Sequence, residues 1–274
     1  MKSKKVKIYS ENAEFQKFEV LKNNRNKRHR YNEFFVEGVR NINNAIRNKW
    51  KIKAFIYTED KKLSDWAMDI LNQNIAEIIY DIPLNLMEKL SDKENTSELI
   101  AIVEMSDDDT KNIKLKSKKI PLIVIIDRPS NRGNLGTIIR SCDALGADGI
   151  IITGHTVDLY DPQTIVASMG SFFEIPVIKM ESHKEVLEYA NELKNKYFDL
   201  QIIGTTAKTE QTIHDVDFKK PTILLIGNET SGLSFSYKDM SNTLCKIPMT
   251  GSASSLNIAC ATTVLLSEIN RQRS

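Results

Sequence analysis

Hydrophobic positions in the second half of the chain form short continuous runs separated by segments with helical spacing. From Ile120 onward, the apolar runs are IPLIVIID, GIIITG, IPVIKM, LQIIGTT, PTILLIG and CKIPM. Helical patterns lie between them, notably over residues 183–196, and a long helix is expected to begin near Ser254 or Ser255. Continuous apolar strands that alternate with helices are typical of parallel strands covered on both faces. The pattern therefore predicts an α/β domain with a mainly parallel sheet over residues 120–274.

The first hundred residues show a more mixed pattern. Residues 34–57 predict a strand, an amphipathic helix and a second strand, and a further helix is expected over residues 63–72. Two more strands are expected in IAEIIYDI and ELIAIVEM, with the helical segment PLNLMEKLSD between them. This indicates a small α/β domain over residues 1–107. The charged, aperiodic residues that follow predict a linker at 108–119.

Charge is distributed unevenly along the chain. Residues 1–53 hold 15 Lys and Arg against 5 Glu, a net charge of +10, so the remainder carries −8 of the total of +2. The densest basic segment is KNNRNKRHRYNEFF, and its basic residues are Lys22, Arg25, Lys27, Arg28 and Arg30. Such clusters are typical of surfaces that bind a phosphate backbone, and a solvated basic arm is the alternative.

Composition narrows the class of protein. With 274 residues and 41% hydrophobic content, the chain can bury a substantial core. It has no apolar run long enough for a membrane span and no signal peptide, so we expect a cytoplasmic protein without a membrane partner. The odd number and spacing of Cys142, Cys245 and Cys260 argue against disulfides and a metal site, so we expect reduced, mostly packing thiols.

The stretch NRGNLGTIIRSCDALG, which starts at Asn131, predicts a helix, and Asn134 is expected to cap it. Its apolar stripe is formed by Leu135, Ile138, Ile139, Cys142 and Leu145. At 100° per residue, Arg140 lies about 160° from the centre of this stripe and should point away from its own sheet. The spacing of Gly133 and Gly136 does not fit a dinucleotide-binding turn, so a Rossmann dehydrogenase is disfavoured.

Three motifs follow predicted strands of the second domain, where ligand sites of α/β sheets gather. The first is N-x-x-x-x-x-R at Asn134 and Arg140, the second is GNETSGL at 227–233, and the third is SSLN at 254–257. In this order they resemble the signature motifs of the SpoU/TrmH family of SPOUT RNA methyltransferases, over almost all of residues 120–274. The basic first domain is more loosely similar to the small RNA substrate-binding domain that many members carry.

The resemblance implies a methyl transfer from S-adenosyl-L-methionine to a ribose 2′-hydroxyl of RNA. It also implies a deep trefoil knot in the second domain and a homodimer that pairs through this domain, with the active site near the interface. Ribosomal RNA is favoured over transfer RNA because of the separate first domain. Open alternatives are the same reaction on transfer RNA, methylation of a base, and an RNA-binding module without catalysis.

The resemblance also assigns candidate site residues. The expected cofactor-binding residues are Thr205, Gly227, Ile247 and Leu256. The expected catalytic residues are Asn134, Arg140, Glu229, Ser255 and Asn257. Because a guanidinium group is very reluctant to lose a proton, we expect Arg140 to stay cationic, hold a neighbouring phosphate and stabilise the developing alkoxide. Gln163 and Val166 stand where many relatives have basic residues.

Overall fold

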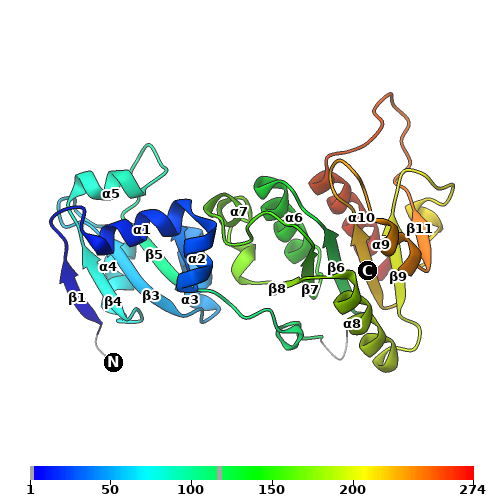
Figure 1. Cartoon of the computed structure of the whole chain (residues 1–274), viewed down its shortest axis with the longest axis horizontal. Helices are drawn as coiled ribbons and strands as arrows, with labels where there is room; N and C mark the ends of the chain where they lie inside the picture. The colour runs from blue at the N-terminus through cyan, green and yellow to red at the C-terminus, as the bar shows by residue number, and fades with distance from the viewer. Residues whose placement is uncertain (1–2, 116–118) are drawn as a thin grey trace. The chain divides into compact units, whose positions relative to one another are not determined.

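The computed structural model describes residues 3–115 and 119–274, and these residues form two compact units (Figure 1). The first unit comprises residues 1–106 together with 158–173, and the second comprises 107–157 and 174–274. The first unit therefore includes a segment, 158–173, that sequence analysis places in the second domain. Residues 116–118 of the expected linker lie outside the described residues.

The described residues of the first unit form a five-stranded mixed sheet with the strand order β1, β4, β3, β5, β2. Strands β1, β3 and β4 run parallel to one another, whereas β5 runs antiparallel to both β3 and β2. Sequence analysis missed β1 and the helices α1, α2 and α7. In chain order the elements are β1 (Lys4–Lys7), α1 (Ala13–Asn23), α2 (Arg25–Tyr31), β2 (Glu33–Glu37), α3 (Val39–Arg47), β3 (Ile52–Tyr57), α4 (Asp65–Asn72), β4 (Ile78–Asp81), α5 (Leu84–Leu90), β5 (Leu99–Glu104), α7 (Pro162–Ala167) and a 3₁₀ turn at Ser171–Phe173.

The segment 158–173 is held in the first unit by packing and by ion pairs. The rings of Phe172 and Phe173 pack against Phe34 and Trp50, and the Trp50 indole donates to the Phe173 carbonyl at 3.2 Å. Buried aromatic side chains of this size contribute much of the apolar area in a core. Without this segment, the aromatic side chains of β2 and of the turn before β3 would lose much of their cover.

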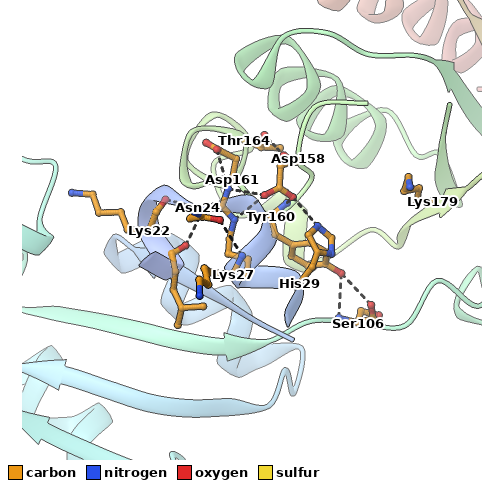
Figure 2. A network of polar contacts seen from close by, with 12 residues as sticks. Lys22, Asn24, Lys27, His29, Ser106, Asp158, Tyr160, Asp161, Thr164 and Lys179 are labelled. Carbon is orange, nitrogen blue, oxygen red and sulfur yellow. Dashed lines mark hydrogen bonds and ion pairs between the residues drawn. The ribbon is translucent and has the colours of Figure 1, made fainter. Parts of the chain in front are cut away.

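Arg28 is the polar centre of this packing, which corrects its assignment to an RNA-facing basic cluster. The side chain is buried, and Figure 2 shows Asp158 and Asp161 converging beside helix α2. Its Nε donates to Asp158 at 2.8 Å, Nη2 lies 2.6 Å from Asp158 and 3.2 Å from Asp161, and Nη1 donates to the carbonyls of Leu21 and Lys22. These partners use the five donors of the guanidinium group.

The rest of the basic segment also offers fewer free cations for a phosphate backbone than its sequence indicates. Lys22 pairs with Asp92 at 2.6 Å, and its side chain is largely buried. Arg30, on the same helix as Arg28, is exposed. Burial and internal pairing therefore remove two of the five cations from the surface that the sequence predicts.

The second unit confirms the predicted mainly parallel α/β sheet. Its described residues form a six-stranded sheet in the order β11, β9, β10, β6, β7, β8, and every neighbouring pair is parallel. Every residue of the central strands β6, β10 and β7 is buried, which explains their continuous apolar runs. The elements are a 3₁₀ turn at Thr110–Asn112, β6 (Leu122–Asp127), α6 (Arg132–Ala144), β7 (Gly149–Thr153), β8 (Val177–Met180), α8 (His183–Lys196), β9 (Gln201–Thr205), a 3₁₀ turn at Ile213–Asp215, β10 (Thr222–Ile226), α9 (Phe235–Met240), β11 (Thr243–Cys245) and α10 (Ile258–Arg273).

Two local predictions for this unit were wrong. The strand expected in CKIPM lies earlier, because β11 ends at Cys245, and helix α10 begins only at Ile258. The expected linker contains the 3₁₀ turn, followed by the buried Ile113 in the core of this unit. Cys142 and Cys245 are buried thiols as expected, whereas Cys260 is exposed.

Among the described residues, no helix is both long and apolar enough to cross a membrane.

Candidate functional site at the carboxyl ends of β6, β9 and β10

Helix α6 presents the first motif as the sequence predicts. Leu135, Ile138 and Ile139 are buried, whereas Arg140 is exposed and makes no hydrogen bond or ion pair with any described residue. Asn134 does not cap the helix as expected. That position belongs to Asn131, whose side chain accepts the N–H of Asn134 at 2.9 Å. The side chain of Asn134 is therefore free to interact with other loops.

The Glu229 carboxylate is the acceptor that joins two loops of the site. It accepts from the Ser130 hydroxyl at 2.7 Å and from the Ser130 N–H at 3.2 Å. The amide groups of Asn134 and Asn228 donate to it at 3.4 and 3.3 Å. The half-buried side chain of Glu229 thus links the loop after β6 to the loop after β10.

These hydrogen bonds change the acidity of Glu229. Burial raises the pKa of this carboxyl group, but the hydrogen bonds from Ser130, Asn134 and the backbone outweigh burial, so its pKa is lowered overall. Hydrogen bonds to the charged form of a carboxyl group favour ionisation. Glu229 is therefore an ionised acceptor at neutral pH.

The third motif reaches the same cluster through Asn257. Its amide nitrogen donates to the Asn134 side chain at 3.1 Å, while its carbonyl oxygen caps α10 by accepting from the N–H groups of Ala259 and Cys260. Helix α10 packs against α6, and the hydroxyls of Ser141 and Thr263 lie 2.7 Å apart. Asn134, Glu229 and Asn257 therefore form one continuous polar chain, drawn from all three motifs.

A cavity of about 460 Å³ lies beside this polar chain. All four expected cofactor-binding residues line it, and so do the candidate catalytic residues Glu229 and Ser255. Its wall is formed by the chain ends that follow β9, β10 and β11, together with the first turns of α10. The volume lies within the range that is usual for ligand pockets. The cofactor residues predicted in the sequence therefore share one cavity.

Gly227 is required by a close approach of backbone within the cavity wall. A Cβ atom at this position would lie 2.2 Å from the Leu233 backbone nitrogen and 2.3 Å from the Gly232 carbonyl carbon. The loop closes through two backbone hydrogen bonds between Asn228 and Gly232. A larger residue at position 227 would push this loop apart, because Cβ atoms do not approach backbone atoms so closely.

The structure does not bring every candidate together. Arg140 lies six residues beyond Asn134 on α6, about 9 Å along the helix axis, and does not line the cavity. Ser255 is exposed in the loop before α10 and lines the cavity. The catalytic candidates therefore fall into three groups. Asn134, Glu229 and Asn257 are joined by hydrogen bonds, Ser255 lies on a loop that lines the cavity, and Arg140 is exposed and separate from both.

Sequence reasoning missed several residues that hold the site in place. Ser130 and Asn228 carry most of the hydrogen bonds to Glu229, and Asn131 caps α6 beside them. Asn228 also accepts from the N–H groups of Thr230 and Ser231. Turns rich in Ser and Asn are a sequence signal for such side-chain-to-backbone bonds. The sequence does not show that these side chains meet Glu229, because Ser130 and Glu229 lie on different loops that only the fold brings together.

Comparison with known proteins gives the family. The model of the SpoU rRNA Methylase family matches residues 121–267, and the SpoU L30e-like domain matches residues 12–101. The 23S rRNA (uridine(2479)-2′-O)-methyltransferase of Streptomyces viridochromogenes is 41% identical over 97% of this chain and 92% of that protein.

Two solved structures are similar to this one over nearly their whole length. The SpoU methyltransferase AviRb from Streptomyces viridochromogenes, in complex with the cofactor AdoMet, has a TM-score of 0.88 at 40% identity over 96% of this chain and 98% of that chain. An AdoMet-bound rRNA methyltransferase from Sinorhizobium meliloti has a TM-score of 0.84 at 26% identity, over 97% and 98%. The family model and the identity over nearly the whole chain together show that this protein belongs to the SpoU rRNA methylase family.

Proposed function

We propose that the chain transfers a methyl group from S-adenosyl-L-methionine to a ribose 2′-hydroxyl of ribosomal RNA. The observation that carries this proposal is the cavity at the carboxyl ends of the parallel strands, with the chain of Asn134, Glu229 and Asn257 beside it. Family membership and the names of its relatives, which include a 23S rRNA 2′-O-methyltransferase, support the same reaction.

The residues present fit S-adenosyl-L-methionine. The cavity combines apolar side chains, among them Ile247 and Leu256, with polar groups such as the Thr205 hydroxyl and the Glu229 carboxylate. An adenine ring suits the apolar wall, whereas an amino acid moiety needs polar partners. When bound there, the cofactor supplies a methyl group on a sulfonium centre. The residues named for this role in the sequence are Thr205, Gly227, Ile247 and Leu256.

Glu229 organises the site in this proposal and does not act as a base. Its two oxygens already accept hydrogen bonds from Ser130, Asn134 and Asn228, and its pKa is lowered. A general base works best when its pKa is near the working pH. The pKa of Glu229 is shifted downward, away from neutral pH, so this carboxylate is a weak base. The carboxylate instead holds the loop after β6 against the wall of the cavity.

Arg140 is the candidate for contact with RNA. An exposed guanidinium without an internal partner has its planar donors available for a phosphate group and for a ribose oxygen that gains negative charge. The hydroxyl proton leaves to solvent while Arg140 remains cationic. Ser255 and Asn257 complete the polar surroundings.

The proposal also includes a homodimer, a trefoil knot in the second unit and a cytoplasmic location. A homodimer paired through the second unit would give the exposed Arg140 a shared active site to face. A trefoil knot would hold the loops after β10 and β11 at one cavity, as the family resemblance implies. The first unit would select the RNA in the cytoplasm, and its exposed cations would make binding dependent on salt.

A labelling experiment tests this function. The purified chain is incubated with methyl-labelled S-adenosyl-L-methionine and total RNA, and the labelled nucleotide is mapped. We expect label on one ribose of ribosomal RNA, and a 2′-O-methyl group placed there beforehand should abolish it. Label confined to transfer RNA, or to a base, would contradict the proposal. Absence of cofactor binding in calorimetry would indicate an RNA-binding module without catalysis.

A further inference from the structure

Arg128, directly after β6, has an unusual backbone conformation. Its φ is +53°, in the left-handed region, although it is not glycine and precedes Pro129. Left-handed backbone is unfavourable for a residue with a side chain, and a following proline favours extended backbone instead. Its neighbour Gly154 is also left-handed, at φ +71°, and a Cβ there would lie 2.8 Å from Cγ of Arg128. The surrounding structure must therefore hold Arg128 in place.

The side chain of Arg128 ties together both loops of the site. Its Nε and Nη2 donate to the two oxygens of Asp127 at 2.9 Å each, and Nη2 also donates to the Gly232 carbonyl at 3.2 Å. Asp127 is almost fully buried and accepts the Ser234 N–H at 2.9 Å. The Arg128 guanidinium and the Asp127 carboxylate thus bind the loop after β10 at Gly232 and at Ser234.

The backbone of Arg128 makes the third connection. Its carbonyl accepts from the Asn228 side chain at 2.7 Å, and its N–H donates to the Thr153 carbonyl in the adjacent strand β7. The left-handed turn at Arg128 then sends the chain to Ser130, whose N–H and hydroxyl bind Glu229. Conformation and contacts therefore act on the same loop, the one formed by residues 227–233 in the cavity wall.

We propose that Arg128 is a positioning residue for the methyl transfer: it fixes the loop 227–233, and through that loop the cofactor cavity and Glu229. This inference rests on the proposed function. Arg128 itself does not line the cavity, so it acts through Gly232 and Asn228. A planar fork is needed, because a lysine ammonium would not hold both oxygens of Asp127 and the Gly232 carbonyl in this geometry.

The test compares Arg128→Ala and Arg128→Lys with Arg271→Ala in the full-length protein. Arg271 is a matched control, because it forms the same two-bond fork to Glu268, at 2.8 and 2.7 Å, and lies outside the cavity wall. The measurements are binding of S-adenosyl-L-methionine by calorimetry, the KM for cofactor and for RNA, kcat, and the melting temperature.

We expect both Arg128 variants to bind cofactor about tenfold more weakly, as for the loss of a charged hydrogen bond. Their KM for cofactor should rise more than their KM for RNA, and Arg271→Ala should bind as the wild type does. If Arg128→Ala does not fold, Arg128→Lys carries the test, since it keeps the charge and loses only the fork.

Two results would overturn the inference. One is normal cofactor binding by folded Arg128→Lys, and the other is an equal loss in Arg271→Ala. A wild-type protein that binds no S-adenosyl-L-methionine would instead overturn the proposed function, and the inference with it. If the wild type and the Arg128 variants bind S-adenosyl-L-methionine equally well, only the role of Arg128 is overturned, and the proposed function stands.

Discussion

Helix α2 of the first unit and helix α6 of the second each carry an arginine that the sequence analysis expects to face RNA, and the two end in opposite environments. Arg28 on α2 is buried, with its donors used by Asp158, Asp161 and two carbonyls. Arg140 on α6 is exposed and has no partner among the described residues. A cation whose donors are all used internally serves folding, whereas one with its donors free is available to a ligand.

The largest effect should come from removing the buried cation. Arg28→Ala removes the cation that pairs with the buried carboxylates of Asp158 and Asp161, and we expect a loss of about 3–5 kcal/mol in the free energy of unfolding. Urea denaturation measures this loss. The control is Arg30→Ala, an exposed arginine on the same helix. Equal stability of the two variants would mean that the Arg28 network does not stabilise the first unit.

Removal of the exposed cation should affect rate and leave stability unchanged. We expect Arg140→Ala to lower single-turnover methylation about 100-fold, the scale found when one group that stabilises a developing oxyanion is removed. The melting temperature should stay at the wild-type value. Arg140→Lys keeps the charge but lacks the planar fork. A near-normal rate for this variant across the pH range would contradict a bidentate clamp.

Glu229 is intermediate between the buried Arg28 and the exposed Arg140, because it is half-buried and hydrogen-bonded. Its contribution to stability should depend on pH. Its lowered pKa means that folding favours the carboxylate, so the stabilisation is present above the ordinary value of 4.5 and is lost as pH falls through the lower folded-state value. The difference in melting temperature between wild type and Glu229→Gln should therefore be constant from about pH 7 to about pH 5 and shrink below that.

A control separates this effect from general acid denaturation. The control is Glu188→Gln, which alters an exposed carboxyl group on α8, outside the site, and so reports the background of acid denaturation. A difference for Glu229→Gln that persists unchanged at low pH would indicate a role in packing and not in charge.

The smallest effect should come from Arg30, the exposed neighbour of Arg28. If the first unit binds an RNA backbone, Arg30→Ala should weaken RNA binding by a small factor and lower the slope of log affinity against log salt by about one. Fluorescence anisotropy at several salt concentrations measures both. An unchanged slope would mean that Arg30 contacts no phosphate, which would leave α2 a structural helix.

Local hydrophobic spacing is enough to place the elements that depend on neighbouring residues alone. Strands β6, β7 and β10 are buried throughout and largely apolar because both faces of their sheet are covered. Arg140 points outward because the opposite face of α6 is apolar. The three motifs indicated the family, and the four cofactor candidates named with it line one cavity. Periodicity and motif spacing are properties of neighbouring residues, so they can be recognised without the fold.

Which charges are paired and which loops are joined depends on contacts between residues that are far apart in the chain. Arg28 meets Asp158 across 130 positions of sequence, and Glu229 meets Ser130 across 99. The segment 158–173 joins the first unit for the same reason, since its aromatic side chains are covered there by residues distant in sequence. A buried charge or ring needs partners that surround it in space, and sequence distance says nothing about those partners.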